Sequence, residues 1–505
     1  MTTAPIRRRS DGPDTSPNHS SVATLGTTVA DPAEIAELPD RLSGRRLLGT
    51  GQAYGMAAVL LAVVGVLGWH AVTGGGPSFT WWGRLFIALI TVVYVVVIGF
   101  KLALVFGAGG APVLRFEPED LGALPDSVLP GYTILVPLHR EGAVLPHLLS
   151  RLADLDYPAD RLQILLLIEE DDDETKGALA KLTPGPQFHT VIIPPEGPRT
   201  KPKACNVGLR QATGEFCVIF DAEDRPERDQ LRKAVLAFRT MPDRVVCIQA
   251  ELQYWNPWTN WLTQCFAAEY ATNFSLSLRG LDRHRLAIPL GGTSNHFRTD
   301  ALRRLGAWDP YNVTEDADLG IRIARRGWDV RMMVSVTEEE ANSHLGNWIR
   351  QRSRWIKGYY QTWLVHMRNP WLLWRELGTR RFLAFHLTLG FSTFTTLVNP
   401  LFWAMTMLYF ATGTRYIAGL FPAPVLYLGM ATMVLGNLMM CYCLMTGCME
   451  RGLHRAVRAM LTVPLYWGLM SIASYKAFLQ LLRPSRRHYW ELTVHGLVEQ
   501  EPEPE

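Results

Sequence analysis

This 505-residue chain has few cysteines and a small net charge. No two cysteines have Cys-x-x-Cys spacing, and the seven are Cys205, Cys217, Cys247, Cys265, Cys441, Cys443 and Cys448. We therefore expect reduced thiols rather than a disulfide framework or a zinc site. The 50 Lys and Arg residues nearly balance the 47 Asp and Glu residues, and no aromatic-basic RNA-binding motif is visible. The sequence predicts no nucleic-acid partner.

Long apolar segments, in contrast, are plentiful and form two groups around a hydrophilic centre. A helix that crosses a hydrocarbon core of about 30 Å needs about 20 apolar residues. Five segments meet that length: Ala53 to Val72, Trp81 to Phe106, Phe382 to Ala411, Ile417 to Met449, and Met460 to Leu482. We expect membrane helices there, although Lys476 inside the last segment is costly in a bilayer.

Basic residues flank these segments unevenly. Arg41, Arg45 and Arg46 precede the first segment, Lys101 closes the second, and the loop between them has no Lys or Arg. Because cytoplasmic loops are enriched in Lys and Arg, we predict a multi-pass protein of the cell membrane whose N-terminus and centre are cytoplasmic. A fifth crossing would place the basic residues at 483, 486 and 487 outside. The last segment is therefore re-entrant or interfacial, or two spans are merged, and we favour a cytoplasmic tail.

From Gly131 onward, short apolar runs alternate with helical patterns, as in a mostly parallel sheet with crossover helices. Strands are predicted at Tyr132–Pro137, Ile164–Ile168 and Phe216–Phe220, and helices at Val144–Leu155 and around Lys203–Gln211. Polar residues follow each strand: His139, Arg140 and Glu141; Glu169 to Asp173; and Asp221 to Asp224. Ligands of such sheets bind beyond the carboxyl ends of the strands, so a nucleotide pocket is predicted there.

The third predicted strand ends in Asp221-Ala222-Glu223-Asp224. Carboxylates gathered at a sheet edge suit hard divalent cations, which predicts Mg²⁺ or Mn²⁺. Such an ion would bridge a nucleotide diphosphate and offset the charge that develops on it. Asp221 and Glu223 are the favoured ligands. Asp224 is a further candidate that could instead cap a helix near Pro226.

Three polar signatures lie in order between the apolar groups: the acidic motif at 221–224, Thr314-Glu315-Asp316, and Gln351-Arg352-Ser353-Arg354-Trp355. With them, roughly residues 50 to 496 resemble membrane-bound family 2 glycosyltransferases of the cellulose synthase type. The resemblance implies a Rossmann-like α/β domain of the GT-A type between N- and C-terminal transmembrane helices, with a UDP-sugar as donor and GDP-sugar as the open alternative. The family's Asp-x-Asp is altered here, so either Glu223 replaces the second Asp or Asp224 reaches the ion through a shifted loop.

The resemblance also implies roles for residues on the donor side. The first two strand ends would hold the nucleobase and ribose through Pro137, His139, Glu141 and one acid among Glu169, Glu170 and Asp171. Lys201, Lys203 and Asn206, in Lys-Pro-Lys-Ala-Cys-Asn, match the family's lysine and asparagine element near the donor. A lysine near a helix start can meet a phosphate.

Asp316 corresponds to the family's catalytic base, which takes the proton of the acceptor hydroxyl in inverting transfer, and Glu315 lies beside it. An acid at a helix start is also favoured by the helix dipole alone. Gly292, Thr293, Ser294 and Asn295 match a loop on the acceptor side. In the Gln-x-x-Arg-Trp motif, with Gln351 and Arg352, Arg354 would contact the diphosphate and Trp355 would stack on the acceptor sugar.

The Gln-x-x-Arg-Trp motif lies on an amphipathic stretch from about Leu345 to Met367. We expect that stretch to lie in the membrane interface with its aromatic residues, Trp348 among them, at the headgroups. Near the end, Tyr489 to Gly496 weakly resembles loops that close over the nucleotide, with Trp490, Thr493 and His495 as candidates. A tail that contacts lipid is the alternative.

These expectations combine into a domain plan and a function. The predicted parts are a disordered cytoplasmic arm (1–45), two transmembrane helices (46–110), a cytoplasmic catalytic domain (111–343), interfacial helices (344–380), a C-terminal transmembrane region (381–483) and a cytoplasmic tail (484–505). The preferred function is a processive inverting synthase that lengthens a β-linked, glucan-like polysaccharide and passes it through the membrane. The alternative is a non-processive enzyme that transfers one sugar to a lipid, and a transporter with a nucleotide-binding domain is a third class.

Overall fold

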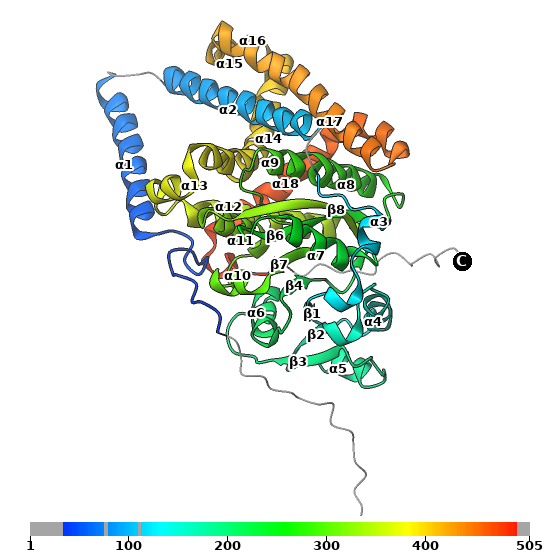
Figure 1. Ribbon diagram of the computed structural model, residues 1–505. Helices are drawn as coiled ribbons and strands as arrows, with labels where there is room; N and C mark the ends of the chain where they lie inside the picture. Colours follow the sequence, from blue (N-terminus) through cyan, green and yellow to red (C-terminus); the bar gives the residue numbers. More distant parts are fainter. Residues whose placement is uncertain (1–33, 75–78, 110–112, 492–505) are drawn as a thin grey trace, which may run out of the picture.

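The computed structural model describes residues 34–74, 79–109 and 113–491, and its central feature is one eight-stranded sheet with the order β3-β2-β1-β4-β7-β6-β8-β5 (Figure 1). The strands are β1 (Tyr132–Leu138), β2 (Leu162–Glu169), β3 (Phe188–Ile193), β4 (Phe216–Ile219), β5 (Arg225–Pro226), β6 (Val245–Tyr254), β7 (Asn295–Arg298) and β8 (Asp329–Glu339). The helices of this domain are α3 (Pro118–Gly122), α4 (Leu145–Ala153), α5 (Asp173–Leu179), α6 (Lys201–Gln211), α7 (Gln230–Thr240), α8 (Trp261–Thr272), η3 (Asn273–Leu278), α9 (Arg279–Arg283), α10 (Thr299–Arg304), α11 (Glu315–Arg325) and α12 (Leu345–His366).

The first half of the sheet is parallel, and its strands β1, β2 and β4 are buried on both faces. β1 pairs in parallel with β2 and β4, and β2 pairs in parallel with β3. Alternate residues of β1 enter opposite cores: Ile134 and Val136 share one with the leucines of α4, and Leu135 shares the other with Leu209 of α6. The three predicted strands are confirmed, and their carboxyl ends meet at one edge of the sheet.

The second half of the sheet is mixed, which the sequence did not predict. β7 lies antiparallel between β4 and β6, whereas β6 and β8 are parallel and β5 is antiparallel to β8. A strand of four residues such as β7 is too short to show a clear alternation of apolar and polar residues. The whole domain is an α/β fold with the Rossmann-like arrangement expected of the GT-A type.

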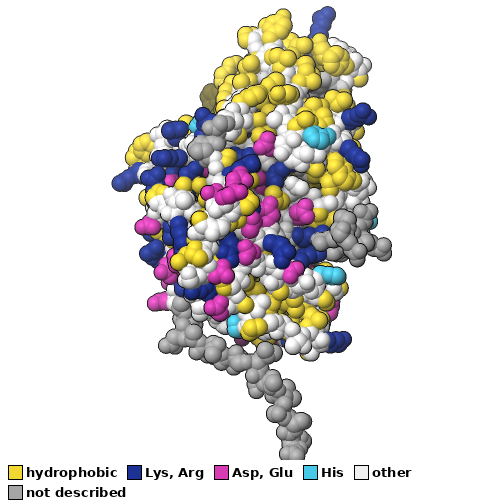
Figure 2. Space-filling model, turned by 45° about the vertical axis from the view of Figure 1, so that its right-hand side comes forward, with side chains coloured by type: hydrophobic (Ala, Val, Ile, Leu, Met, Phe, Trp, Pro, Cys, Tyr) yellow, Lys and Arg dark blue, Asp and Glu magenta, His cyan; other side chains and the backbone are white. Residues whose placement is uncertain are grey.

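Five helical stretches are long and apolar enough to cross a membrane: Thr50–Thr73, Thr80–Ala108, Pro370–Thr412, Ala423–Glu450 and His454–Leu482. They comprise α1 (Thr50–Thr73), α2 (Phe79–Ala108), α13 (Pro370–Phe385), η4 (His386–Phe391), α14 (Ser392–Thr412), α16 (Ala423–Ala431), η5 (Thr432–Gly436), α17 (Asn437–Glu450), η6 (His454–Thr462) and α18 (Val463–Leu482), with α15 (Arg415–Leu420) joining α14 to α16. Each predicted apolar segment falls on one of them. α1 stands apart from the others in Figure 1, and Figure 2 shows apolar side chains over the upper part of the molecule and charged ones below.

The last stretch packs against the catalytic domain, because α18 lies along α12. Near its start, Tyr466 contacts Arg352, and near its end, Gln480 accepts a hydrogen bond from Lys357 at 3.0 Å. Between these points Ala473 and Ala477 pack against Ile356. Both ends of α18 therefore contact one helix of the catalytic domain.

Candidate active site

A single cavity of about 1640 Å³ connects the carboxyl ends of the parallel strands with the bundle of apolar helices. Its polar end is lined by residues that follow β1, β2 and β4 and by the start of α11. Its other end is lined by side chains of α2, α14, η5, α17 and α18, such as Val97, Phe402, Met433 and Trp467. The predicted pocket is thus one part of a larger space that extends into the apolar bundle.

Asp221 and Asp316, which lie far apart in the sequence, meet at the polar end. The Lys201 ammonium lies 2.6 Å from Asp221 Oδ1 and donates to the carbonyl of Gly292 at 2.9 Å. A Cβ atom on Gly292 would lie 3.7 Å from Asp316 Oδ2. Although burial alone would lower the pKa of Lys201, Asp221 outweighs it and raises that pKa. One cationic group therefore bridges the acidic motif after β4 and the loop beside Asp316.

The acids of the 221–224 motif point in different directions. Asp221 and Glu223 line the cavity, whereas Asp224 is buried and its carboxylate accepts from the backbone N–H of Asp221 at 2.6 Å and from Thr293 Oγ1. Burial, together with Asp221, raises the pKa of Asp224. Asp224 therefore stabilises the turn after β4. The alternative from sequence, a helix cap near Pro226, is wrong, because Arg225–Pro226 forms β5 and the next helix begins at Gln230.

Glu315 and Asp316 begin α11 and both line the cavity. Asp316 Oδ1 accepts from the backbone N–H of Ala317 at 2.8 Å. Burial raises the pKa of Asp316, and burial beside Asp316 raises the pKa of Glu315. A carboxylate whose pKa is raised is a stronger base than a solvated one, which suits proton abstraction near neutral pH.

The Gln-x-x-Arg-Trp motif on α12 faces the same cavity. Arg354 is buried near Glu315, Asp316 and Asp221, and burial lowers the pKa of its guanidinium. Arg352 instead pairs with Glu269 of α8, and Gln351 accepts from Asn342 Nδ2 at 2.9 Å. Trp355 stacks on Tyr270 with ring centroids 6.0 Å apart. Arg354 is thus the cation that is positioned beside the acids.

The expectation that Trp348 lies at the lipid headgroups is wrong. Trp348 has no exposed surface and packs edge-on against Tyr466 of α18, with ring centroids 5.1 Å apart. The aromatic spacing of α12 therefore reflects, at Trp348, packing against α18. Helical periodicity in the sequence cannot distinguish a lipid surface from a second apolar helix.

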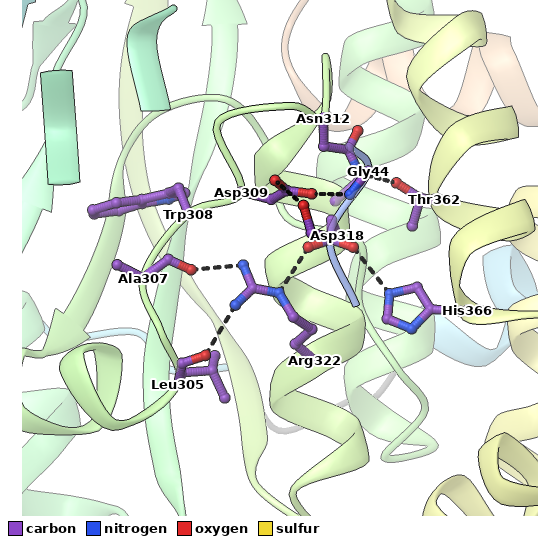
Figure 3. A network of polar contacts seen from close by, with 12 residues as sticks. Gly44, Leu305, Ala307, Trp308, Asp309, Asn312, Asp318, Arg322, Thr362 and His366 are labelled. Atoms are coloured by element: carbon purple, nitrogen blue, oxygen red, sulfur yellow. Dashed lines mark hydrogen bonds and ion pairs between the residues drawn. The ribbon is translucent and has the colours of Figure 1, made fainter. Parts of the chain in front are cut away.

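A buried polar network fixes α11 against α12 (Figure 3). Asp318 accepts from Arg322 Nε at 2.7 Å and contacts His366 Nε2 at 3.0 Å. Burial would raise the pKa of Asp318, but Arg322 and His366 outweigh it and hold that pKa below its usual value. Asp309, in the loop before α11, accepts from the backbone N–H of Gly44 and so attaches the segment before α1 to the same region. The network positions the start of α11, where Asp316 lies.

Glycine at position 358 permits the close approach of α12 to α11. A Cβ atom there would lie 2.7 Å from Cβ of Thr314 and closer still to its Oγ1 and Cγ2 atoms. Carbon atoms in ordinary contact are about 3.5–4.0 Å apart. Gly358 lies three residues after Trp355 on the same helix, so the helix of the Gln-x-x-Arg-Trp motif contacts the Thr314-Glu315-Asp316 signature.

The structure brings together only some of the residues expected on the donor side. Pro137, His139, Glu141 and Glu169 line the cavity, whereas Glu170 and Asp171 are exposed outside it. Lys203 and Asn206, which were expected beside the donor, do not line the cavity. The Lys203 side chain donates to the carbonyl of Pro194, and Asn206 bonds to the backbone of Trp308 at 2.8 Å, so both hold loops in place.

The acceptor loop also differs from expectation, because only its glycines line the cavity. Gly291 and Gly292 border it, whereas Thr293, Ser294 and Asn295 are buried. Ser294 Oγ bonds to Thr337 at 2.6 Å, and Asn295 Nδ2 donates to the carbonyl of Gly291 at 2.6 Å. These side chains attach the loop to the sheet, since Asn295 already begins β7.

The tail after α18 returns to the active site. The guanidinium of Arg354 lies over the ring of Trp490 at 4.6 Å, and Trp490 lines the cavity. Lys357 Nζ donates to the carbonyl of Tyr489 at 2.7 Å. The other two gating candidates, Thr493 and His495, lie outside the described residues.

Residues 130–358 match the family model described as glycosyltransferase like family 2. The chain carries a family 2 glycosyltransferase domain. Beta-monoglucosyldiacylglycerol synthase of Trichormus variabilis is 27% identical over 371 residues, which cover 72% of this chain and 71% of that protein. Putative cellulose synthase 2 of Komagataeibacter xylinus is 26% identical over 321 residues, 57% of this chain and 19% of that protein. The mannosyltransferase PcManGT of Pyrobaculum calidifontis, solved with GDP-Man and Mn²⁺, is 20% identical over 68% of this chain and 98% of that one, with a TM-score of 0.39.

The acidic side chains of this glycosyltransferase site supply only part of what a bound metal ion needs. Within residues 34–74, 79–109 and 113–491, no group of three or more His, Cys, Asp and Glu side chains is arranged to hold a metal. Asp221 and Glu223 nevertheless face the cavity. Mg²⁺ is usually held by one or two carboxylates together with substrate phosphates. The two acids therefore fit an ion that arrives with a nucleotide diphosphate.

Sequence reasoning missed two functional candidates of the glycosyltransferase domain. Glu339, at the end of β8, lines the cavity, and burial near Glu223 and Asp221 raises the pKa of its carboxyl. Glu269, on α8, lines it too and pairs with Arg352. Glu339 is the second of three consecutive glutamates, 338 to 340, that follow an apolar run, a pattern that could have pointed to a strand end at the site. Nothing in the sequence around Glu269 indicated its role.

Proposed function

We propose that this glycosyltransferase moves one sugar from a nucleotide-sugar to a hydroxyl of a membrane lipid, with inversion at the anomeric carbon. The observation that carries the proposal is the continuity of the cavity from Asp316 to the apolar side chains of the bundle. A lipid that enters between the helices could keep its acyl chains against residues such as Met433 and Leu444 while its headgroup reaches the acids. A wholly soluble acceptor would leave that apolar lining without a role.

The relatives support the same choice. The similarity to the monoglucosyldiacylglycerol synthase covers 371 residues, which is more than the family match alone and therefore includes flanking parts of the chain. The similarity to the putative cellulose synthase covers only 19% of that protein. A lipid acceptor, named as the alternative from sequence, is for these reasons preferred to a growing polysaccharide.

In the proposed mechanism, the oxygen of the acceptor hydroxyl attacks the anomeric carbon while Asp316 removes the proton of that hydroxyl. The raised pKa of Asp316 suits this role. Glu315 lies beside Asp316, and its own carboxyl pKa is raised as well. Arg354 and Lys201 are the cations beside the acids, and we assign them to the departing diphosphate. A divalent ion held by Asp221 and Glu223 would supply further charge compensation when bound.

The remaining cavity residues receive binding roles. Glu169 is the acid that we assign to the nucleobase or ribose, since Glu170 and Asp171 lie outside the cavity. Pro137, His139 and Glu141 border the same end. Trp355 is assigned to the acceptor side, and Trp490 is assigned to a tail that covers Arg354.

We also propose the membrane arrangement. The catalytic domain and the tail lie on the same side, which the basic residues identify as cytoplasmic. α18 lies in the interface along α12, so the chain crosses the bilayer through the other four stretches. This arrangement corresponds to the interfacial alternative for the last segment and removes the conflict with the basic residues after Leu482.

A processive synthase is the second candidate, and it has an observation of its own. Aromatic and hydroxyl side chains, including Trp403, Trp467 and Thr396, line the cavity within the bundle, and sugars stack well on aromatic rings. The Gln-x-x-Arg-Trp motif accompanies processive synthesis across the family that the sequence resembles. Product length distinguishes the two candidates.

The test uses the purified full-length chain in lipid nanodiscs with a panel of labelled UDP- and GDP-sugars and Mg²⁺ or Mn²⁺. We expect a chloroform-soluble glycolipid that requires added lipid acceptor, and an Asp316→Asn variant that binds nucleotide but forms no product. Label in an ethanol-insoluble polymer, formed without added lipid acceptor, would favour the synthase. Nucleotide binding without transfer from any donor, in the unaltered chain as in the variant, would contradict both.

A further inference from the structure

Three polar side chains line the cavity at the junction between the catalytic domain and the bundle. Lys101 comes from α2, and Asn273 and Ser277 come from η3. In the described part of the chain, none of the three side chains forms a hydrogen bond or an ion pair with another residue. All three groups can donate a hydrogen bond, and one is a cation. A cavity wall of this composition suits an anion.

The contacts around these residues show that they lie in one region. Lys101 is near Glu269 of α8, and three residues later Leu104 lies against Gly280 of α9, where a Cβ atom would clash with the carbonyl of Leu104. α2 also packs directly against η3, because Val105 and Leu276 belong to one buried apolar cluster. Asn273 and Ser277 belong to η3, the element that packs against this part of α2.

The nearby carboxylate cannot neutralise Lys101 fully. Glu269 already pairs with Arg352 and accepts from Tyr466 Oη at 2.5 Å. Lys101, Arg352 and Glu269 together leave one positive charge at the wall of the cavity. The Lys101 side chain is only partly exposed, so an anionic ligand in the cavity would be stabilised there.

The segment that carries Asn273 and Ser277 is unusual and rigidly held. η3 is a π-helix, a form that is rare in proteins and is frequently found at functional sites. Its opposite side is fixed by Ser275, which accepts from Arg451 Nε at 2.6 Å, and by the ion pair of Arg279 with Glu251 at 2.6 Å. The π-helix therefore presents its two polar side chains to the cavity from a fixed backbone.

We propose that Lys101, Asn273 and Ser277 bind the phosphate group of a membrane lipid. This site rests on the proposed function, since it assumes that a lipid enters the cavity from the bundle. It is separate from the donor site, because Lys201 and Arg354 are the cations near Asp221 and Asp316 whereas Lys101 is near Glu269. The proposal narrows the lipid to one with a phosphate in its headgroup.

The test measures lipid binding rather than turnover. The full-length chain is purified in dodecyl maltoside, a detergent without phosphate, and titrated with phosphatidylglycerol or with diacylglycerol of the same acyl chains. Lys101→Gln is expected to weaken phosphatidylglycerol binding about tenfold or more, the cost of one charge-assisted hydrogen bond, and to leave diacylglycerol binding unchanged. Lys101→Arg is expected to retain binding, and the double variant Asn273→Ala with Ser277→Ala to weaken it.

Arg458→Gln is the matched control, because Arg458 is exposed near the bundle and does not line the cavity. It is expected to bind both lipids like the unaltered chain. Equal binding by Lys101→Gln and the unaltered chain would overturn the proposal, as would an equal loss in Arg458→Gln. Full competition by millimolar inorganic phosphate would identify free phosphate as the ligand instead of a lipid. Because no nucleotide is present, these outcomes are independent of whether the enzyme makes a glycolipid or a polymer.

Discussion

Replacing Gly358 by alanine should disable catalysis without harming the fold of the donor site. The new Cβ atom would lie 2.7 Å from Thr314 Cβ, so α11 and α12 would have to separate by about 1 Å to restore ordinary carbon contact. Overpacking of this kind costs about 1–3 kcal/mol of stability. Because Asp316 begins α11, the same displacement moves the base away from the acceptor, and a shift of about 1 Å costs about 100-fold in rate.

The assay compares kcat for sugar transfer with nucleotide affinity in each variant. Gly358→Ala is expected to lower kcat about 100-fold at nearly unchanged nucleotide affinity. Adding Thr314→Gly removes the clashing side chain and should restore most of the rate, since the Thr314 hydroxyl has no hydrogen-bond partner among the described residues and glycine is an acceptable helix cap. Gly346→Ala, on the same helix with no atom within 4 Å of the new Cβ, is the control. Full activity of Gly358→Ala would refute the packing of α12 on α11.

Three further predictions follow from the same site. Because burial raises the pKa of Asp316 and the base must be ionised, kcat should fall on acidification at a pH above the ordinary aspartate value of about 3.9, as measured by a pH–rate profile, and a profile that is flat down to pH 4 would contradict this role. Asp318→Leu leaves Arg322 buried without its carboxylate and should lower the free energy of unfolding by about 3–5 kcal/mol, measured by SDS titration in mixed micelles. Adding Arg322→Met should recover most of that loss, and additive losses would show that the two residues do not interact. Removal of divalent ions with EDTA should abolish transfer, and Mg²⁺ or Mn²⁺ should restore it in the unaltered chain but not in Asp221→Asn. Asp224→Asn should still respond to the added ion, because Asp221 faces the cavity whereas Asp224 does not.

The part of the fold that could be predicted is the part with strong local patterns. Mostly apolar runs such as Tyr132–Pro137 identified the parallel strands, because a strand buried on both faces has few polar positions. The antiparallel strand β7 was missed because Asn295–Arg298 is short and contains mostly polar residues. Its identity depends on pairing with β4 and β6, which local sequence does not reveal.

The sequence predicted residues of the candidate site where a motif indicates a specific chemical role. Asp221, Asp316 and Arg354 all line one cavity, as the order of the three signatures implied. The side chains of Lys203 and Asn295 were assigned to ligands but hold backbone carbonyls instead. Motif position specifies which loop approaches the site, whereas the direction of each side chain depends on backbone geometry. That geometry is set by distant contacts, such as the one between Asn206 and Trp308.

The position of α18 has a consequence for how the enzyme is made. Tyr466, Trp467 and Trp490 form part of the cavity wall, yet the ribosome adds them after the entire catalytic domain. A nascent chain that has already folded its sheet still lacks this wall, so water enters the site and competes with the acceptor. Protection of the reacting sugar from hydrolysis therefore begins only when translation has passed residue 490 and α18 has settled on α12.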